Sequence, residues 1–227
     1  MLINCYWVVV KMARKLVVPC IQVALDNVNE NETMRVCEQL PRDQRIILEA
    51  GTPLIKQCGI GIVRRIKQAS GNAFVVADLK TLDVGALEVQ IAGNGGADAA
   101  ICAGVAGIPT IDSFVAEARK QGVMSFVDMM NVADARALLK GLKQLPDGVS
   151  LHRGIDAEVA GARSSLDAVK KLKSDFPSLK VAVAGGMDDK TAREAVKAGA
   201  DVVVVGRFIT GAQDPAQEAM RVLGSFE

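Results

Sequence analysis

The chain has 227 residues and half of them are hydrophobic, which is enough to bury a large core in one domain. Its 27 lysines and arginines nearly balance 26 aspartates and glutamates, which argues against a general nucleic-acid binder with a basic face. The five cysteines form no CxxC pair and no zinc spacing, so they predict free thiols in a cytoplasmic protein.

Residues 1–15 are expected to be an extension outside the folded domain, either non-native or disordered. Met1 to Val10 is apolar and precedes Lys11, whereas a signal peptide carries its charges before the apolar run. The run is also shorter than the roughly 20 residues that a membrane span requires. Met12 is an alternative start, residues 16–227 are expected to form one domain, and no membrane partner is expected.

Short runs rich in Val, Ile or Ala alternate with longer amphipathic stretches along the rest of the chain. These runs show little polar alternation, which is typical of strands buried on both faces of a parallel sheet. Eight of them are expected as strands: 20–25, 45–49, 74–78, 97–102, 123–128, 149–152, 180–184 and 201–205.

The stretches between these runs carry apolar residues at helical spacing, most clearly over 110–121, 133–145 and 190–198. Gly122 and Gly199 stand where a helix would end before the next strand. Eight such units favour a closed (β/α)8 TIM barrel over an open doubly wound sheet. No dinucleotide-binding fingerprint follows the first strand, which also disfavours the open sheet.

Polar side chains gather at the carboxyl ends of the expected strands, where barrel enzymes place their active sites. A single acid after a strand is often a helix N-cap, the role expected of Asp134 and Asp188. Several acids, a lysine and the sole histidine at equivalent positions favour catalysis, since imidazole transfers protons near neutral pH. The candidates are Asp26, Glu49, Asp78, Lys80, Asp83, Asp128 and His152.

The densest cluster is Asp78-x-Lys80-x-x-Asp83. Side chains alternate along a strand, so Asp78 and Lys80 should lie on one side, while Asp83 can turn inward or outward. Glu49 and Asp78 end adjacent strands, and their hard oxygens suit Mg²⁺, with Mn²⁺ as a substitute. Because the protein would supply only a few ligands, coordination positions of the metal ion stay open for water and substrate.

Glycines follow the last two strands, as Gly185–Gly186 and Gly206–Arg207. Backbone N–H groups of glycine can approach a phosphate closely, and barrels often bind phosphate at this position. Arg207 would add a fork of charged donors. An ordinary pair of tight turns is the alternative, but the arginine and the neighbouring strands favour a phosphate site.

Seven segments carry a family resemblance, in this order: QVALD (22–26), EAGTPLIK (49–56), VADLKTLDVGALE (76–88), VDMMNV (127–132), HRGID (152–156), VAGGM (183–187) and VVVGRFITGAQDP (203–215). From about Pro19 onward the chain resembles the orotidine-monophosphate decarboxylase superfamily and, within it, the archaeal-type 3-hexulose-6-phosphate synthase family. The resemblance implies Mg²⁺-dependent condensation of formaldehyde with D-ribulose 5-phosphate through an enediolate, or the reverse cleavage. It also implies a homodimer with shared active sites.

The resemblance further implies a role for each candidate residue. Mg²⁺ would be bound by Glu49 and Asp78, an enediolate would be stabilised by Lys80, and the C1 proton would be moved by His152. Asp83 would reach into the neighbouring subunit's site. Substrate hydroxyls and phosphate would be held by the remaining candidates, namely Asp26, Asp128, Gly185, Gly186, Gly206 and Arg207.

Two other functions stay open. The 3-keto-L-gulonate-6-phosphate decarboxylase family shares the metal site but has an arginine three residues after the histidine, where this chain has Ile155 and instead carries Arg153. A non-catalytic barrel that binds sugar phosphates is the other, since fold alone does not fix function. Orotidine-monophosphate decarboxylase itself is disfavoured, because that family has a further lysine ahead of the motif and none occurs between Lys67 and Lys80. The stretch CAGVAGIPT (102–110) departs from the polar residues usual in synthases, and the physiological direction stays undetermined.

Overall fold

Parallel strands form a closed barrel in the computed structural model, which describes residues 12–152 and 166–227. Each strand pairs with its neighbour in chain order, and β8 pairs with β1 to close the ring. The expected single-domain (β/α)8 TIM barrel is therefore confirmed. The strands are β1 Cys20–Leu25, β2 Ile46–Ala50, β3 Val75–Thr81, β4 Ala99–Ala103, β5 Met124–Asp128, β6 Gly148–His152, β7 Lys180–Ala184 and β8 Val202–Val205.

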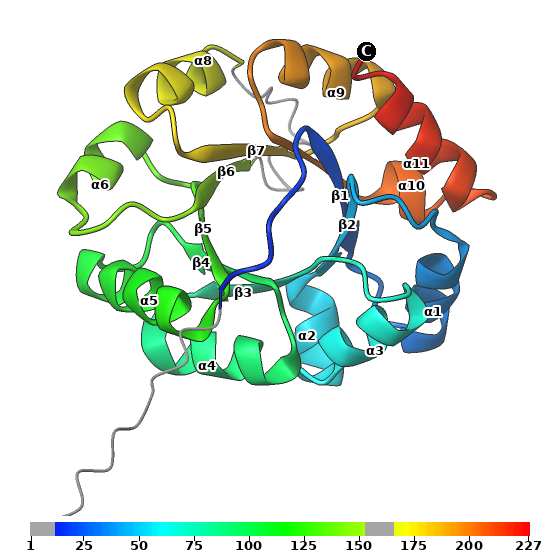
Figure 1. Cartoon of the computed structure of the whole chain (residues 1–227), viewed down its shortest axis with the longest axis horizontal. Coiled ribbons are helices and arrows are strands. Elements are labelled where there is room, and N and C mark those ends of the chain that lie inside the picture. The colour runs from blue at the N-terminus through cyan, green and yellow to red at the C-terminus, as the bar shows by residue number, and fades with distance from the viewer. Residues whose placement is uncertain (1–11, 153–165) are drawn as a thin grey trace, which may run out of the picture.

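Helices surround the barrel in a ring (Figure 1). They are α1 Glu30–Gln39, α2 Thr52–Cys58, α3 Ile62–Ala69, α4 Gly85–Gly95, α5 Ile108–Gln121, α6 Ala135–Gly141, α8 Leu166–Asp175, α9 Asp189–Lys197, α10 Arg207–Thr210 and α11 Pro215–Gly224. Asp134 and Asp188 are N-caps, as expected, and Gly122 and Gly199 end helices with φ of 64° and 102°. Within the described residues, no helix combines the length and apolarity needed to cross a membrane.

The expected strand positions agree with the structure to within two residues, except in β3. This strand runs to Thr81 rather than ending at Asp78, with an irregular register in its last part. The helix expected over 133–145 also ends early, because Leu142 is already extended. In both segments the backbone departs from the conformation of a regular strand or helix.

The hydrophobic core has two layers that follow from the alternation of side chains along each strand. Outward-facing residues such as Val23, Leu48 and Val183 pack against the helices. Inward-facing residues fill the barrel, among them Ile47 and Phe126. Four cysteines, Cys20, Cys37, Cys58 and Cys102, are free thiols as expected, and Cys5 lies outside the described residues.

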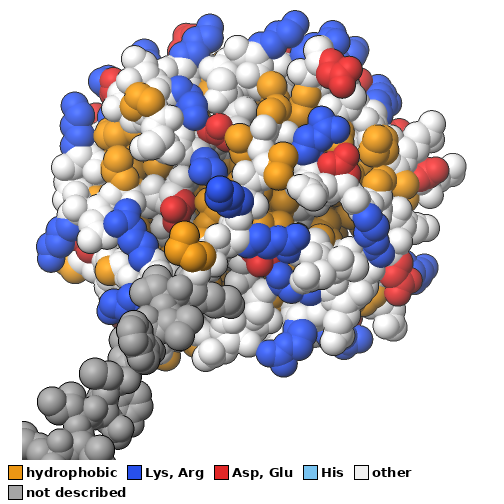
Figure 2. Space-filling model, viewed as in Figure 1, with side chains coloured by type: hydrophobic (Ala, Val, Ile, Leu, Met, Phe, Trp, Pro, Cys, Tyr) orange, Lys and Arg blue, Asp and Glu red, His pale blue; other side chains and the backbone are white. Residues whose placement is uncertain are grey.

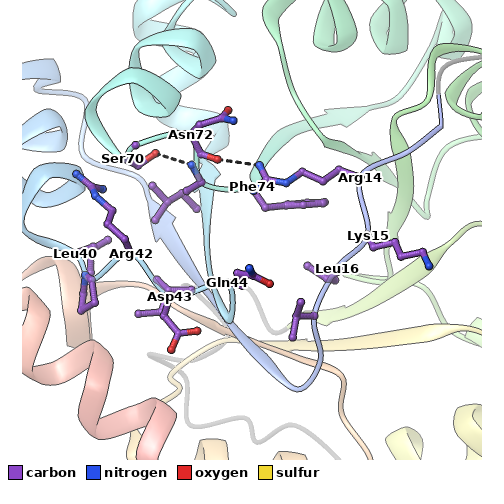
Figure 3. A pocket seen from close by; sticks show the side chains of 16 residues that line it. Arg14, Lys15, Leu16, Leu40, Arg42, Asp43, Gln44, Ser70, Asn72 and Phe74 are labelled. Carbon is purple, nitrogen blue, oxygen red and sulfur yellow. Dashed lines mark hydrogen bonds between the residues drawn. The ribbon is translucent and has the colours of Figure 1, made fainter.

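The segment before β1 crosses the opening at the amino ends of the strands (Figure 1). Leu16 packs against the interior layer, and Arg14 donates a hydrogen bond to the carbonyl of Asn72 at 2.9 Å. A pocket of about 300 Å³ lies beside this segment (Figure 3). Arg42 in its wall already donates to the carbonyls of Cys37 and Ala69. On this face, basic and acidic side chains are interspersed with apolar and uncharged ones (Figure 2).

Candidate active site

The largest pocket described lies at the opposite end of the barrel, at the carboxyl ends of the strands, and has a volume of about 1010 Å³. Parallel strands bring their carboxyl ends to one rim, so residues far apart in sequence meet there. All but one of the expected site residues line it: Asp26, Glu49, Asp78, Lys80, Asp128, His152, Gly185, Gly186, Gly206 and Arg207. The exception is Asp83.

Lys80 and His152 converge on one carboxylate, that of Asp128. The Nζ atom of Lys80 donates to Oδ2 of Asp128 at 3.0 Å and to Oδ2 of Asp78 at 2.7 Å. Nδ1 of His152 lies 2.7 Å from the same Oδ2 atom of Asp128. If the neutral ring carries its proton on Nδ1, then Nε2 is left as the basic atom. The arrangement therefore pairs an ammonium group with a proton acceptor.

The charges of this network shift the pKa values of its members. Burial alone would lower the pKa of Lys80, but Asp78 and Asp128 outweigh it and raise that pKa above its usual range. Burial alone would raise the pKa of Asp128, but the hydrogen bond and charge of His152, with Lys80, lower it. Lys80 is therefore a fixed positive charge, suited to stabilise an anion rather than to accept a proton.

Glu49 and Asp78 are both buried, 6% and 4% exposed, and lie on neighbouring strands. Gln22 donates to Oε2 of Glu49 at 2.5 Å, and Thr52 donates to Oδ2 of Asp78 at 2.9 Å. Burial, and then the charge of Asp78, raise the pKa of Glu49 well above its usual range. The metal-free site thus favours the protonated form of Glu49 beside the carboxylate of Asp78.

Oδ1 of Asp78 is buried and accepts no hydrogen bond. A buried oxygen without a partner is costly, and a cation would satisfy it. Within the described residues, no group of three or more His, Cys, Asp or Glu side chains could hold a metal ion. The partnerless oxygen of Asp78, beside the carboxylate of Glu49, would suit a cation that takes few protein ligands, which is the manner in which Mg²⁺ is commonly held.

The two glycine turns lie on the same rim, after β7 and β8. Gly185 and Gly186 have φ of 101° and 62°, a region that side chains rarely adopt, so glycine is required there. Gly206 precedes Arg207, whose side chain is exposed at the pocket. The turns bring main-chain groups and a guanidinium to one side of the pocket, across from the carboxylates of β2 and β3.

Asp83 lies outside the pocket of its own chain. It is exposed, and its Oδ1 atom accepts a hydrogen bond from the backbone N–H of Val84 at 2.7 Å. The sequence left its direction open, and the structure turns it outward. Exposed apolar side chains stand beside it in the sequence, along α4, and before and at the start of α5: Leu82, Val84, Leu87, Ile91, Val105 and Ile108, together called here the α4–α5 apolar surface.

Among the residues that were not singled out from the sequence, three contact or make room for the carboxylates of the site. Gln22 shares the inward face of β1 with Asp26, so its alternating position was a usable signal. Thr52, at the start of α2, donates a hydrogen bond to the carboxylate of Asp78, and no local sequence pattern predicts this contact. Gly51 leaves room for Asp26, since a Cβ there would lie 2.1 Å from Oδ1 of Asp26.

Three further expectations concern Asp128, the residues after His152 and the stretch 102–110. Asp128 was expected to hold substrate hydroxyls; its oxygens accept from Lys80 and from the N–H of Met130, and one of them also lies 2.7 Å from Nδ1 of His152. Arg153 and Ile155, which bear on the choice between the two sugar-phosphate families, lie outside the described residues. The unusual stretch 102–110 forms the end of β4 and the start of α5, and contributes Val105 and Ile108 to the α4–α5 apolar surface.

Comparison with known proteins decides the family. The profile of the Orotidine 5′-phosphate decarboxylase / HUMPS family matches residues 19–222. The chain belongs to this family. A bifunctional enzyme Fae/Hps from Methanoculleus marisnigri is 45% identical over 213 residues, which is 92% of this chain and 54% of that protein. The chain thus spans about half the length of the curated relatives it matches.

Solved structures of the family agree with this assignment. The 3-hexulose-6-phosphate synthase from Salmonella typhimurium superposes with a TM-score of 0.84 at 32% identity, covering 91% of this chain and 97% of that one. A structure of KGPDC from Streptococcus mutans gives a TM-score of 0.80 at 26% identity, covering 91% of this chain and 96% of that one. The similar structures thus include a 3-hexulose-6-phosphate synthase and a 3-keto-L-gulonate-6-phosphate decarboxylase (KGPDC), the two enzymes between which the sequence left a choice.

Proposed function

We propose that this family member is a 3-hexulose-6-phosphate synthase, which joins formaldehyde to D-ribulose 5-phosphate or catalyses the reverse cleavage. The observation that carries the proposal is the network of Lys80, Asp128 and His152 beside the buried pair Glu49 and Asp78. This places a proton acceptor, a fixed cation and a metal-compatible carboxylate pair in one pocket. The relatives named Hps and the synthase structure support the same activity.

The residues divide the chemistry between them. Gly185, Gly186, Gly206 and Arg207 bind the phosphate of ribulose 5-phosphate, which fixes the sugar across the pocket. His152, oriented by Asp128, removes the proton from C1. The ammonium group of Lys80 stabilises the negative charge that then develops on the enediolate oxygens.

C1 of the enediolate attacks the carbonyl carbon of formaldehyde, and the resulting alkoxide takes up a proton to give the hydroxyl of 3-hexulose 6-phosphate. Glu49 and Asp78 would hold Mg²⁺, which would supply further stabilisation of negative charge on substrate oxygens. Asp26, at the rim beside these carboxylates, binds a substrate hydroxyl.

The α4–α5 apolar surface supports a homodimer, and we propose that its active sites are shared and that the protein is cytoplasmic. Its members are well exposed, for example Leu82 at 62% and Val84 at 54%. Gly85 lets α4 approach α5 closely, since a Cβ there would lie 2.4 Å from the carbonyl oxygen of Thr110. A twofold pairing through this surface would carry Asp83 toward the partner's pocket.

A turnover assay of the purified protein tests the proposal directly. Ribulose 5-phosphate and formaldehyde are supplied with and without Mg²⁺, and 3-keto-L-gulonate 6-phosphate is supplied in parallel. We expect Mg²⁺-dependent formation of 3-hexulose 6-phosphate. Faster turnover of the keto acid would replace the synthase with the decarboxylase, and binding of sugar phosphate without any turnover would indicate a non-catalytic barrel.

A further inference from the structure

Lys80 reaches its two carboxylates from an unusual backbone conformation. Its φ is 45°, in the left-handed region that residues other than glycine rarely adopt. The pairing of β3 with β4 slips at the same point: Ala77 faces Ala100, but Thr81, rather than Leu79, faces Cys102. Such a conformation persists only where the surrounding structure holds it.

The structure holds the residue that directly follows Lys80. Thr81 is 1% exposed, and its hydroxyl donates a hydrogen bond to the carboxylate of Glu88 in the first turn of α4. Its carbonyl oxygen accepts from the Sγ atom of Cys102 on β4 at 3.2 Å. Both the side chain and the main chain of Thr81 are therefore fixed, each by a different neighbouring element.

The thiol of Cys102 is suited to remain a donor in this arrangement. Burial, with a contribution from the charge of Glu88, raises the pKa of Cys102 to about 12. The thiol therefore keeps its proton at neutral pH and can donate to the carbonyl of Thr81. Glu88 in turn lies near the amino end of α4, where a negative charge is favourable.

We infer that Thr81, held by Glu88 and Cys102, is a positioning residue that fixes the left-handed backbone of Lys80 and so directs its ammonium group into the pocket. The inference rests on the proposed function and deepens it. Without the hydroxyl of Thr81, the end of β3 can relax toward a regular register. Nζ of Lys80 would then leave its position between Asp78 and Asp128.

The decisive variant is Thr81→Val, which keeps the shape of the side chain and removes the hydroxyl. We expect kcat for aldol formation to fall on the order of 10- to 100-fold, as is typical when a catalytic group is misplaced. The Kd for ribulose 5-phosphate, measured by calorimetry, should change little, because Lys80 acts mainly on charge that develops during the reaction. Thr81→Ser retains the donor and should keep most of the parent kcat.

Glu88→Leu removes the acceptor of the same hydrogen bond and should reproduce the loss. The double variant Thr81→Val/Glu88→Leu should be no slower than either single variant, since both act through one bond. Ser125→Ala is the matched control: its buried hydroxyl donates to the carboxylate of Asp147 at 2.9 Å, toward the amino end of β5. This control should lower the Tm and leave kcat unchanged.

The outcomes separate this inference from the proposed function. A parent protein without turnover defeats the proposed function, and a crystal structure of Thr81→Val then tests the inference alone. Positive φ at Lys80 and unchanged Nζ contacts in that structure would overturn it, whereas a regular β3 would support it. With an active parent, parent-like kcat in Thr81→Val, or an equal loss in Thr81→Ser, would also overturn it.

Discussion

Nδ1 of His152 lies 2.7 Å from Oδ2 of Asp128, and the same oxygen accepts a hydrogen bond from Lys80. One buried carboxylate thus orients the proposed base and the proposed anion-stabilising group together. Asp78 also accepts from Lys80, so the ammonium group lies between two carboxylates, one of which also contacts the proposed base. This relationship explains why Asp128 is 3% exposed although it lines the pocket.

Replacing the proposed base should stop the first chemical step. In His152→Ala, we expect exchange of the C1 proton of ribulose 5-phosphate with D2O to fall by on the order of 100-fold or more, even without formaldehyde, because general-base catalysis is lost. Proton NMR follows the exchange. Asp134→Ala, which removes the N-cap of α6 outside the pocket, is a control for general destabilisation. Exchange at the parent rate in His152→Ala would assign the base to another residue.

Removing the metal should remove activity. EDTA is expected to abolish aldol turnover and Mg²⁺ or Mn²⁺ to restore it, because the buried Oδ1 atom of Asp78 has no hydrogen-bond partner and a cation held with Glu49 would satisfy it. Mg²⁺ should also raise the Tm of the parent and not that of Asp78→Ala, which should remain folded but inactive. Full activity in EDTA would contradict the metal site.

The stability of the metal-free protein should depend on pH through Glu49. Burial, and then Asp78, raise the pKa of Glu49 to about 8 in the folded state, from an ordinary value of 4.5. This contribution is fully present below the ordinary value and is lost as the pH rises through the folded-state pKa. The free energy of unfolding should therefore fall by roughly 3 to 4 kcal/mol between about pH 5 and 8.

Denaturant unfolding at several pH values measures this fall. Glu49→Gln should flatten the dependence, because the amide does not ionise, and Mg²⁺ should restore stability to the parent at the alkaline end. An equal slope in the parent and in Glu49→Gln would show that another group is responsible.

The choice of reaction should depend on position 155, which the resemblance singles out. The parent should decarboxylate 3-keto-L-gulonate 6-phosphate slowly or not at all. Ile155→Arg should gain this activity by on the order of 10-fold, because a guanidinium would bind an anionic intermediate. Release of carbon dioxide measures the reaction, and no gain would remove position 155 from the explanation of specificity.

Two inactive variants should restore each other if the sites are shared. Lys80→Ala and Asp83→Ala are mixed under conditions that allow subunit exchange. In a mixed dimer one site carries both changes and the other is intact. Random mixing makes about half the dimers mixed, so about a quarter of all sites should recover. Exchange demonstrated by labelled subunits without recovered activity would mean that Asp83 acts within its own chain or not in catalysis.

The sequence by itself determined the strands and the residues at their carboxyl ends. Buried runs such as 180–184 are typical of strands with both faces covered, and the parallel arrangement then brings Asp26, Glu49, Asp78 and His152 to one rim. Side-chain alternation and local capping are short-range effects, so they can be read from neighbouring residues alone.

Only the tertiary structure decided how these side chains pair. Asp78 and Lys80 do meet as expected, but through a left-handed residue and a slipped register rather than a regular strand. Asp128 binds Lys80 and His152 because the carboxyl ends of β3, β5 and β6 lie at the same rim of the barrel. Such contacts join residues dozens of positions apart, and their geometry depends on the closure of the whole barrel, which no local pattern contains.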